Sequence, residues 1–471
     1  MRNKGIFAVL FGLAVFLSLW RLQDLARFML DASASQHAIA PTLRDLDDEA
    51  LERSFFPKHS CFTCYVVALE LASEGTENIY NPDHYRDPEH PTEVHEEIGD
   101  LLKIDRYQYP PAFLLLPWAL VQAGGDFFGA RSLFFFLNLG AFALCLWWVQ
   151  SWLRAPGPGL LAPGKAPAWR PAHIWLTWPL VLLAGNTLTT LQIGNVHAFV
   201  MILAILGMLA IRSGYRWLGG ALLGFLTVGK IFPGLLLVYL FARGDRRAVA
   251  WSVAFALLYA LLTFGLFGPE TFLAFFSYQL GRLASGEAFS FAFEYPRAML
   301  VNASFTGIAY RLQQLDLLAD PERVAKLVTW GMGILLLLLA WICGRIWRHS
   351  DSASTGERRH AELGVWLALL LLAQMRSPFL PAGYGSFVVL WLLATLVAAP
   401  GGRTSWYLRA LLAAPIWYLV ATPVPLPFGG SGVRLDFWFG LLGTALALAL
   451  AGAAMARGRR VLRRAPGEQA T

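Results

Sequence analysis

A series of long apolar runs constrains the fold of this chain more than any other feature. A helix that crosses a bilayer needs about 17–25 apolar residues, and only helices or closed barrels satisfy their backbone groups in lipid. The longer runs are Gly5–Trp20, Ser132–Trp152, Val196–Ile211, Ala248–Phe267, Leu327–Ile346, Leu363–Gln374, Phe387–Ala399, Trp406–Ala421 and Phe437–Ala456. Shorter runs are Pro110–Val121, Ile174–Leu191, Trp217–Gly229 and Phe232–Phe241. The sequence predicts an all-α polytopic membrane protein, a helical bundle of about 12–13 membrane segments.

Basic residues gather in short clusters at the ends of these runs. The clusters are Arg212–Arg216, Arg243–Arg247, Arg345–Arg359, Arg403–Arg409 and Arg457–Arg464. Lys and Arg hold short loops in the cytoplasm, so these ends and the N-terminus are predicted to face inward. The chain has a pI of about 9.3. Because its positive charge is spread over helix ends, we do not expect nucleic acid as a partner.

The segment Leu22–Gln108 has the opposite charge. It carries 18 acidic and 7 basic residues, whereas the whole chain has a net charge of +7. Long acidic loops translocate readily, so this segment is predicted to be an outer loop with short helices. The predicted organisation is a retained first membrane helix at 1–21, the outer loop at 22–108, a multi-helix membrane domain at 109–456 and a basic cytoplasmic tail at 457–471.

The stretch Trp217–Phe241 starts and ends beside basic clusters but is interrupted by Gly229-Lys230-Ile231-Phe232-Pro233-Gly234. Two short helices that meet at an outer apex explain this pattern. A broken backbone at membrane depth is tolerated where it is buried or lines a wet cavity. Lys230 at the apex is therefore a candidate cation for a lipid phosphate. The alternative is a lysine whose charge reaches the interface from a helix end.

Other polar groups near the predicted outer surface are candidates for substrate binding. Amide and imidazole groups that open a membrane helix suit sugar hydroxyls or a phosphate, and arginines suit an anionic headgroup. The alternatives to substrate binding are structural roles: helix capping, interfacial anchoring, or an ion pair between Asp105 and Arg106. The candidates are Gln192, Asn195, His197, Arg106, Arg297, Arg311 and Asn302.

The acidic outer loop supplies the candidates for a general base, which must lie within hydrogen-bond reach of an acceptor hydroxyl. The candidates are Asp47, Asp48, His59 and Asp83. His59 also precedes Cys61 and Cys64, which form a CxxC pair. A disulfide or two free thiols is a better interpretation than zinc, because no second CxxC or paired histidine completes a site. No metal site is predicted.

Several of these residues, in their order along the chain, carry a resemblance to a known family. The landmarks are Tyr65-Val66-Val67-Ala68 through Gly75 and Ile79-Tyr80; Tyr109-Pro110-Pro111 through Pro117; Gln192-Ile193-Gly194-Asn195; Gly219-Gly220 through Lys230 and Pro233; Asn302 and Ser304 before Arg311; and Ser377-Pro378. From about Cys61 to Tyr384 the chain resembles the GT-C membrane glycosyltransferases. Within them it is most similar to glycosyltransferase family 87, which includes polyprenol-phosphate-mannose-dependent mannosyltransferases.

This resemblance implies a GT-C helical bundle whose active site faces the exterior or periplasm of a bacterial inner membrane. The implied reaction is an inverting transfer of a mannose-like hexose or a pentose. The donor would be a polyprenyl-phosphate sugar, and the acceptor a hydroxyl of a lipid or glycan. An acidic residue of the first outer loop would act as base. No cofactor is expected beyond this donor, and a need for a divalent metal is left open.

The chain departs from the family pattern at two places. Relatives place an Asp about five residues before the tyrosine that corresponds to Tyr65, where this chain has Ser60. Many relatives also carry a His after Ser-Pro, where this chain has Phe379-Leu380-Pro381 and then Tyr384. Tyr384 thus joins the candidates for substrate binding. A catalytically inactive relative that binds lipid or a partner, and a secondary transporter, are the alternative functions.

Overall fold

The computed structural model describes residues 2–30, 59–85, 91–98, 102–154, 173–290, 302–348, 356–399, 406–421 and 432–463. These residues are overwhelmingly helical, which confirms the predicted all-α membrane fold. The strands among them are β1 (His59–Ser60) and β2 (Lys103–Ile104), which pair in parallel. This short pairing ties the end of the acidic segment to the start of its helix at Cys61–Ser73.

The first half of the bundle contains α1 (Arg2–Leu30), α3 (Cys61–Ser73), η3 (Pro82–Tyr85), α4 (Glu93–Ile98), η5 (Pro111–Leu114), α5 (Leu115–Gly124), α6 (Phe127–Arg154), α7 (His173–Leu182), α8 (Gly185–Gln192), α9 (His197–Arg212), α10 (Arg216–Lys230), η6 (Phe232–Gly234) and α11 (Leu235–Arg243). The second half contains α12 (Arg246–Phe267), α13 (Glu270–Ala274), η7 (Phe275–Gln279), α14 (Leu280–Ser285), η8 (Glu287–Phe289), α17 (Phe305–Gln314), α18 (Pro321–Trp347), α19 (Gly356–Met375), α20 (Ala382–Val397), α21 (Trp406–Ala421) and α22 (Gly432–Arg463).

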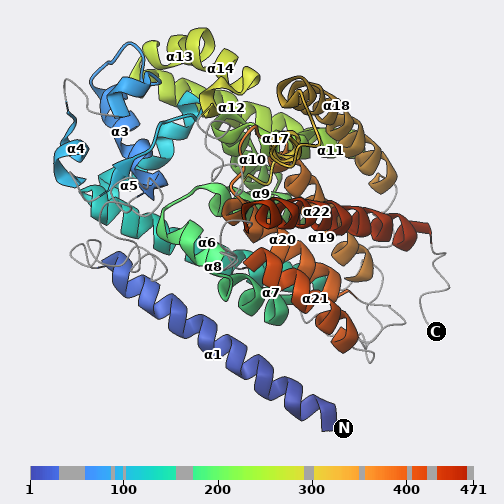
Figure 1. Cartoon of the computed structure of the whole chain (residues 1–471). Helices are drawn as coiled ribbons and strands as arrows, with labels where there is room; N and C mark the ends of the chain where they lie inside the picture. Colours follow the sequence, from blue (N-terminus) through green and yellow to red (C-terminus); the bar gives the residue numbers. More distant parts are fainter. Residues whose placement is uncertain are drawn as a thin grey trace.

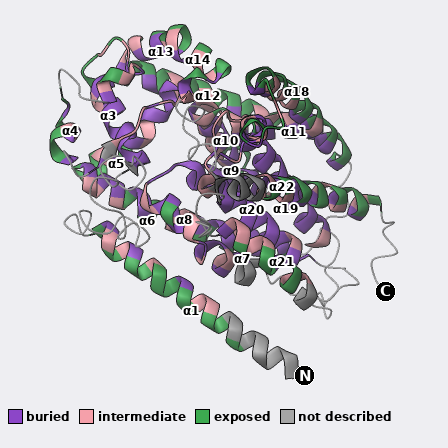
Figure 2. Ribbon diagram, viewed as in Figure 1, coloured by how far each residue is buried: buried purple, intermediate pink, exposed green. Residues whose placement is uncertain are grey.

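The core of the bundle is built by α9, α19 and α20, whose side chains are almost all buried (Figure 2). The longer helices α6 and α22 pack against this core, while α12 packs on α10 and α18 on α11. Together these four helices leave many large apolar side chains exposed. Such an apolar exterior marks a surface that meets other apolar material, here a membrane. The outer-loop helices α3 and α4 gather with α13 and α14 at one end of the molecule (Figure 1).

Among the described residues, four helical segments are long and apolar enough to cross a membrane unaided: Phe127–Arg154, Arg246–Phe267, Pro321–Trp347 and Leu441–Arg463. The pair α8 and α9 forms a fifth candidate, bent by 97° at its break. Several other predicted runs lie in apolar helices of 10–17 residues, among them Pro111–Gly124, Phe232–Arg243, Gly383–Val397 and Arg409–Ala421. A helix of fewer than about 17 residues is too short to span a bilayer alone. The predicted 12–13 segments would therefore require the shorter helices to take part in the membrane region.

The predicted break within Trp217–Phe241 is confirmed. Helix α10 ends at Lys230, η6 follows, and α11 begins at Leu235. Between the helices, Ile231 has φ 62° and ψ −59°, close to the rare and strained form of γ-turn. For a β-branched residue, such a backbone conformation costs about 1–3 kcal/mol and persists only where the surroundings impose it.

Helix α10 is held close to its neighbours by small residues. A Cβ atom built on Gly219 would lie 2.5 Å from the carbonyl oxygen of Gly207 on α9. On the same helix, a Cβ on Gly224 would lie 2.6 Å from the carbonyl oxygen of Ser252 on α12. These close approaches fix the position of α10 and so of Lys230 at its end.

Candidate active site

The candidate site lies where interrupted helices meet the end of the outer loop. The break between α8 and α9 is clasped by the start of α3, because Ser60 Oγ and Phe62 N both donate to the carbonyl oxygen of Ile193, at 3.1 and 3.3 Å. The break after α10 and the start of α20 approach the same place through Phe232 and Tyr384, described below. Polar backbone is thus concentrated at one point of an otherwise apolar bundle.

Gly194 makes this clasp possible. Its φ is +70°, a conformation that L side chains rarely adopt. A Cβ atom at Gly194 would lie 2.8 Å from Cβ of Phe62, so a side chain would also push α3 away. The turn and the close contact therefore both require glycine, which explains why Gly194 stands between Gln192 and Asn195.

Lys230 lies over a cluster of aromatic rings, which we call the tyrosine platform: Tyr65, Tyr80, Tyr107, Tyr109 and Phe113. The ammonium nitrogen of Lys230 is 3.9 Å from the centre of the Tyr109 ring. A cation at this distance from an aromatic face is stabilised by the ring quadrupole. The ring cannot accept all three N–H bonds of an ammonium, so Lys230 retains capacity to bind an anion.

Hydrogen bonds and ring contacts hold the tyrosine platform rigid. The hydroxyls of Tyr65 and Tyr109 are 3.2 Å apart, and Tyr80 Oη donates to the carbonyl oxygen of Tyr109 at 2.9 Å. The rings of Tyr109 and Phe113 stack with centroids 4.5 Å apart. Pro110 and Pro111 turn the chain between these two rings, which accounts for the Tyr-Pro-Pro landmark in structural terms.

A second polar group lies beside Lys230. The ring of His197 lies between those of Phe232 and Tyr384, with centroids 6.1 and 5.7 Å away. Its Nδ1 is 2.8 Å from Oδ1 of Asn195, while Nδ2 of Asn195 donates to Cys61 Sγ at 3.1 Å. Because Oδ1 is an acceptor, Nδ1 carries the proton, and Nε2 is the acceptor of the neutral ring. Cys61 Sγ also lies 3.2 Å from the Tyr384 hydroxyl.

Asp105 brings a carboxylate to this region. Its backbone N–H donates to Thr63 Oγ1 at 3.1 Å, and that hydroxyl donates to the carbonyl oxygen of Ser60 at 2.6 Å. Burial first, and the Asp105 charge second, raise the pKa of the Cys64 thiol well above its usual value. Cys64 therefore stays protonated near neutral pH, and Asp105 is close enough to act on it electrostatically.

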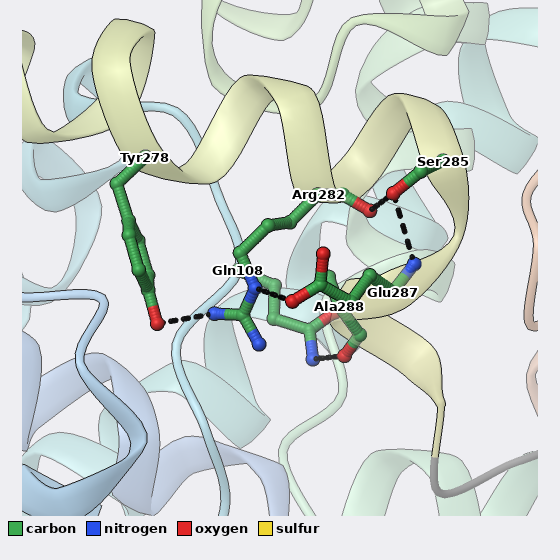
Figure 3. Close-up of polar contacts among 6 residues, drawn as sticks. All are labelled: Gln108, Tyr278, Arg282, Ser285, Glu287 and Ala288. Atoms are coloured by element: carbon green, nitrogen blue, oxygen red, sulfur yellow. Dashed lines mark hydrogen bonds and ion pairs between the residues drawn. The ribbon is translucent and has the colours of Figure 1, made fainter.

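The helices that follow α12 pack against this region, where Phe275 contacts the ring of Tyr80. Figure 3 shows the guanidinium of Arg282 between Tyr278 and Glu287. Its Nη1 donates to the Tyr278 hydroxyl at 2.8 Å and its Nε to Glu287 at 3.0 Å. Gln108 Nε2 donates to the carbonyl oxygen of Ala288 at 2.8 Å, so these helices are joined to the segment that carries Asp105 and Tyr109.

The structure brings some of the predicted site residues together. Cys61 joins Asn195 to Tyr384, and His197 contacts both of these side chains. Lys230 is held on the adjacent tyrosine platform. Gln192 ends α8 at the same break. Lys230 was predicted because a charge inside an apolar run is costly. Gln192, Asn195 and His197 were predicted because they open a membrane helix. Tyr384 was predicted from the departure from the family pattern after Ser-Pro.

Other predicted residues lie elsewhere in the described structure. Arg311 is buried on α17, where its Nη1 donates to Thr444 of α22 at 3.3 Å. Asn302 joins two loops, because its Oδ1 accepts from Leu380 N at 3.0 Å and its Nδ2 donates to the Pro378 carbonyl oxygen at 3.2 Å. The contacts of both side chains therefore support packing between segments.

The predicted bases are only partly described. Asp83 is exposed on η3, and the described contacts do not join it to Lys230 or His197. Arg106 is half-buried next to Asp105. Asp47, Asp48, Arg297 and the side chain of His59 lie outside the described residues. Within the described ranges, no group of three or more His, Cys, Asp or Glu side chains is placed to hold a metal ion.

Two contributors were missed as site residues. Cys61 and Cys64 are two buried thiols with no disulfide between them, one of the two predicted alternatives, but the link that Cys61 makes between Asn195 and Tyr384 was not predicted. Tyr109 was named only as part of the Tyr-Pro-Pro landmark, but its ring supports the Lys230 ammonium. The role of Tyr109 could have been predicted from the spacing of Tyr107 and Tyr109 before two prolines, since this spacing places two aromatic rings beside a fixed turn.

Comparison with known proteins gives one finding. A model of glycosyltransferase family 87 matches residues 107–373, more than half of the 471 residues. The matched range begins in the tyrosine platform and includes Lys230 and His197. No curated protein and no solved structure matches the chain.

Proposed function

This chain belongs to glycosyltransferase family 87 and is a glycosyltransferase with several membrane helices, and we propose that its donor is a polyprenyl-phosphate sugar. In this proposal a mannose-like hexose or a pentose is transferred to a hydroxyl of a lipid or glycan. The reaction takes place at the extracytoplasmic face of a bacterial inner membrane.

The observation that carries this proposal is the position of Lys230. Its ammonium lies at a helix break inside an apolar bundle, on the face of Tyr109. A lipid donor that enters from the bilayer brings a phosphate whose negative charge needs a cation. An ammonium in a region of low dielectric binds a phosphate more strongly than it would in water.

The chemical step follows from this placement. The acceptor oxygen attacks the anomeric carbon, the bond from that carbon to the phosphate oxygen breaks, and the polyprenyl phosphate leaves with the electron pair. Attack opposite the leaving group inverts the configuration. Lys230 stabilises the charge that develops on the leaving phosphate, which is the kind of preorganised electrostatic assistance that lowers a barrier most.

A base must remove the proton from the acceptor hydroxyl. Among the described residues we assign this role to Asp105, because its carboxyl group is close to the polar cluster and its backbone is fixed by Thr63. Asp47, Asp48, His59 and Asp83 remain the competing candidates. We assign the binding of sugar hydroxyls to His197, through Nε2, and to Asn195 and Tyr384, because their contacts gather these three polar side chains beside Lys230.

The proposal is tested with the purified protein in nanodiscs. Polyprenyl-phosphate mannose and polyprenyl-phosphate arabinofuranose are supplied in parallel with a membrane lipid extract as acceptor, and glycosylated products are identified by mass spectrometry. We expect a product that appears with one donor and is lost without it. Donor binding without product would favour an inactive lipid-binding relative, and the absence of product with both donors would overturn the proposed donor class.

A further inference from the structure

A cavity of about 200 Å³ opens at the end of the bundle where α9 leads into α10 and α11 leads into α12. Its charged lining consists of Arg212, Arg216, Arg243 and Asp245. We call it the arginine cavity. A water molecule takes up about 30 Å³ of liquid volume, so the cavity has room for a group the size of a phosphate with some water.

The arginine cavity lies far from the candidate active site. Helix α9 carries His197 at its first residue and Arg212 at its last, and α10 carries Arg216 at its first and Lys230 at its last. A rise of 1.5 Å per residue puts the two ends of α9 about 22 Å apart. The same two helices therefore have one polar site at each end.

The walls of the arginine cavity carry more positive than negative charge. Arg243 donates to Oε1 of Glu362, a carboxylate oxygen that also accepts from the Tyr239 hydroxyl at 3.0 Å. Arg212 Nε lies 3.5 Å from the same oxygen. The guanidinium groups of Arg212 and Arg243 therefore share one buried carboxylate.

Arg216 is the exposed part of this arrangement. It is 44% exposed and forms a pair with Asp245, with Nε 3.4 Å from Oδ1. Exposed ion pairs of this kind contribute little to stability. An incoming anion can therefore replace Asp245 as the partner of Arg216 without breaking a strong interaction, and it can reach Arg212 from the same cavity.

We propose that the arginine cavity binds a phosphate group at the membrane face opposite the active site. Planar guanidinium groups match phosphate oxygens in two-point contacts, and the surplus positive charge favours an anion over a neutral ligand. The phosphate belongs either to the headgroup of an anionic lipid or to a free phosphate compound. The clustered arginines at these loops are those that the positive-inside rule assigns to the cytoplasm, where anionic lipid is abundant.

The test uses the full chain in nanodiscs of phosphatidylcholine. Short-chain phosphatidic acid and inorganic phosphate serve as separate probes, and binding is measured by native mass spectrometry and titration calorimetry. Arg216→Gln and the double variant Arg212→Gln/Arg216→Gln remove cavity charges. Arg247→Gln is the matched control, because Arg247 is an exposed arginine of the same loop region that does not line the cavity.

We expect the wild-type protein to bind at least one probe, and Arg216→Gln to weaken that binding about tenfold, the loss expected for one charge-assisted hydrogen bond. The double variant should lose it further, and Arg247→Gln should not change it. Binding of phosphatidic acid alone would identify a lipid headgroup, and binding of both probes a phosphate group in general. The proposal is overturned if neither probe binds, or if Arg247→Gln weakens binding as much as Arg216→Gln.

Discussion

At the scale of single residues, the most informative side chain is Lys230. An ammonium inside an apolar bundle is costly, and the Tyr109 ring offsets only part of that cost. Lys230 was predicted from sequence because the sequence shows a charged residue inside an apolar run, beside two glycines and a proline, and such a charge is unfavourable in an apolar environment. The roles of Tyr109 and Cys61 depend on contacts between segments far apart in the chain, which a sequence pattern does not contain.

Lys230→Met removes the ammonium but keeps the apolar stem. If Lys230 binds the donor phosphate, kcat/KM should fall about ten- to a hundredfold, the loss of one or two charge-assisted hydrogen bonds. Steady-state kinetics with varied donor concentration would measure this. Lys326→Met is the control, because Lys326 is exposed on α18 and pairs with Glu322. Equal donor dependence in Lys230→Met and wild type would exclude the phosphate role.

Asp105→Asn keeps the shape of the side chain and removes its basicity. General bases contribute about 10²–10⁴-fold to rate, so kcat should fall by that factor while donor binding persists. Asp83→Asn is the comparison, since Asp83 is also a carboxylate of the outer loop but is exposed on η3. Loss of turnover in Asp83→Asn with normal turnover in Asp105→Asn would return the role to the residue predicted from sequence.

At the scale of elements, the site is built from helix ends rather than helix middles. The broken pair α10 and α11 was predicted from Gly and Pro between two apolar stretches, and the structure confirms it. The 97° bend between α8 and α9 was not predicted, although Gly194 marked its place. A single glycine is compatible with many turns, and the bend depends on packing against Phe62, which lies more than a hundred residues earlier.

Gly194→Ala tests this packing against a matched glycine. Gly75 has a similar φ of +76° but open space around its Cβ position, so Gly75→Ala should cost only the backbone strain of about 1 kcal/mol. Gly194→Ala adds a clash with Phe62 and should cost about 2–4 kcal/mol in total. Thermal unfolding in detergent should therefore show a larger decrease in Tm for Gly194→Ala. Equal decreases would mean that α3 moves freely away from the break.

At the scale of the whole molecule, the sequence predicted the fold class and the membrane setting, because apolar runs and charged ends are properties of composition. The sequence was less informative about the number of membrane segments. Several apolar runs, among them α11 and α20, form helices shorter than a bilayer. Their burial depends on neighbours, and an apolar run looks the same in sequence whether it faces lipid or protein.

The orientation of the bundle is open to direct measurement. Glu74→Cys places an exposed thiol at the end of α3, and Arg247→Cys places one beside the arginine cavity. The four native cysteines are buried, so their background should be low. In intact spheroplasts a membrane-impermeant maleimide should label Glu74→Cys alone, and after permeabilisation it should label both. Labelling of Arg247→Cys before permeabilisation would reverse the proposed orientation.

Helix α9 holds His197 at one break and Arg212 at the arginine cavity, with a fully packed stretch between them. One inserted residue would turn everything beyond it by about 100° and shift it by about 1.5 Å. If the end that carries His197 kept its position, the guanidinium of Arg212 would be displaced. If the end that carries Arg212 kept its position, the imidazole of His197 would be displaced. The length of this segment should therefore tolerate neither insertion nor deletion, even where its individual apolar side chains accept exchange for others of similar size.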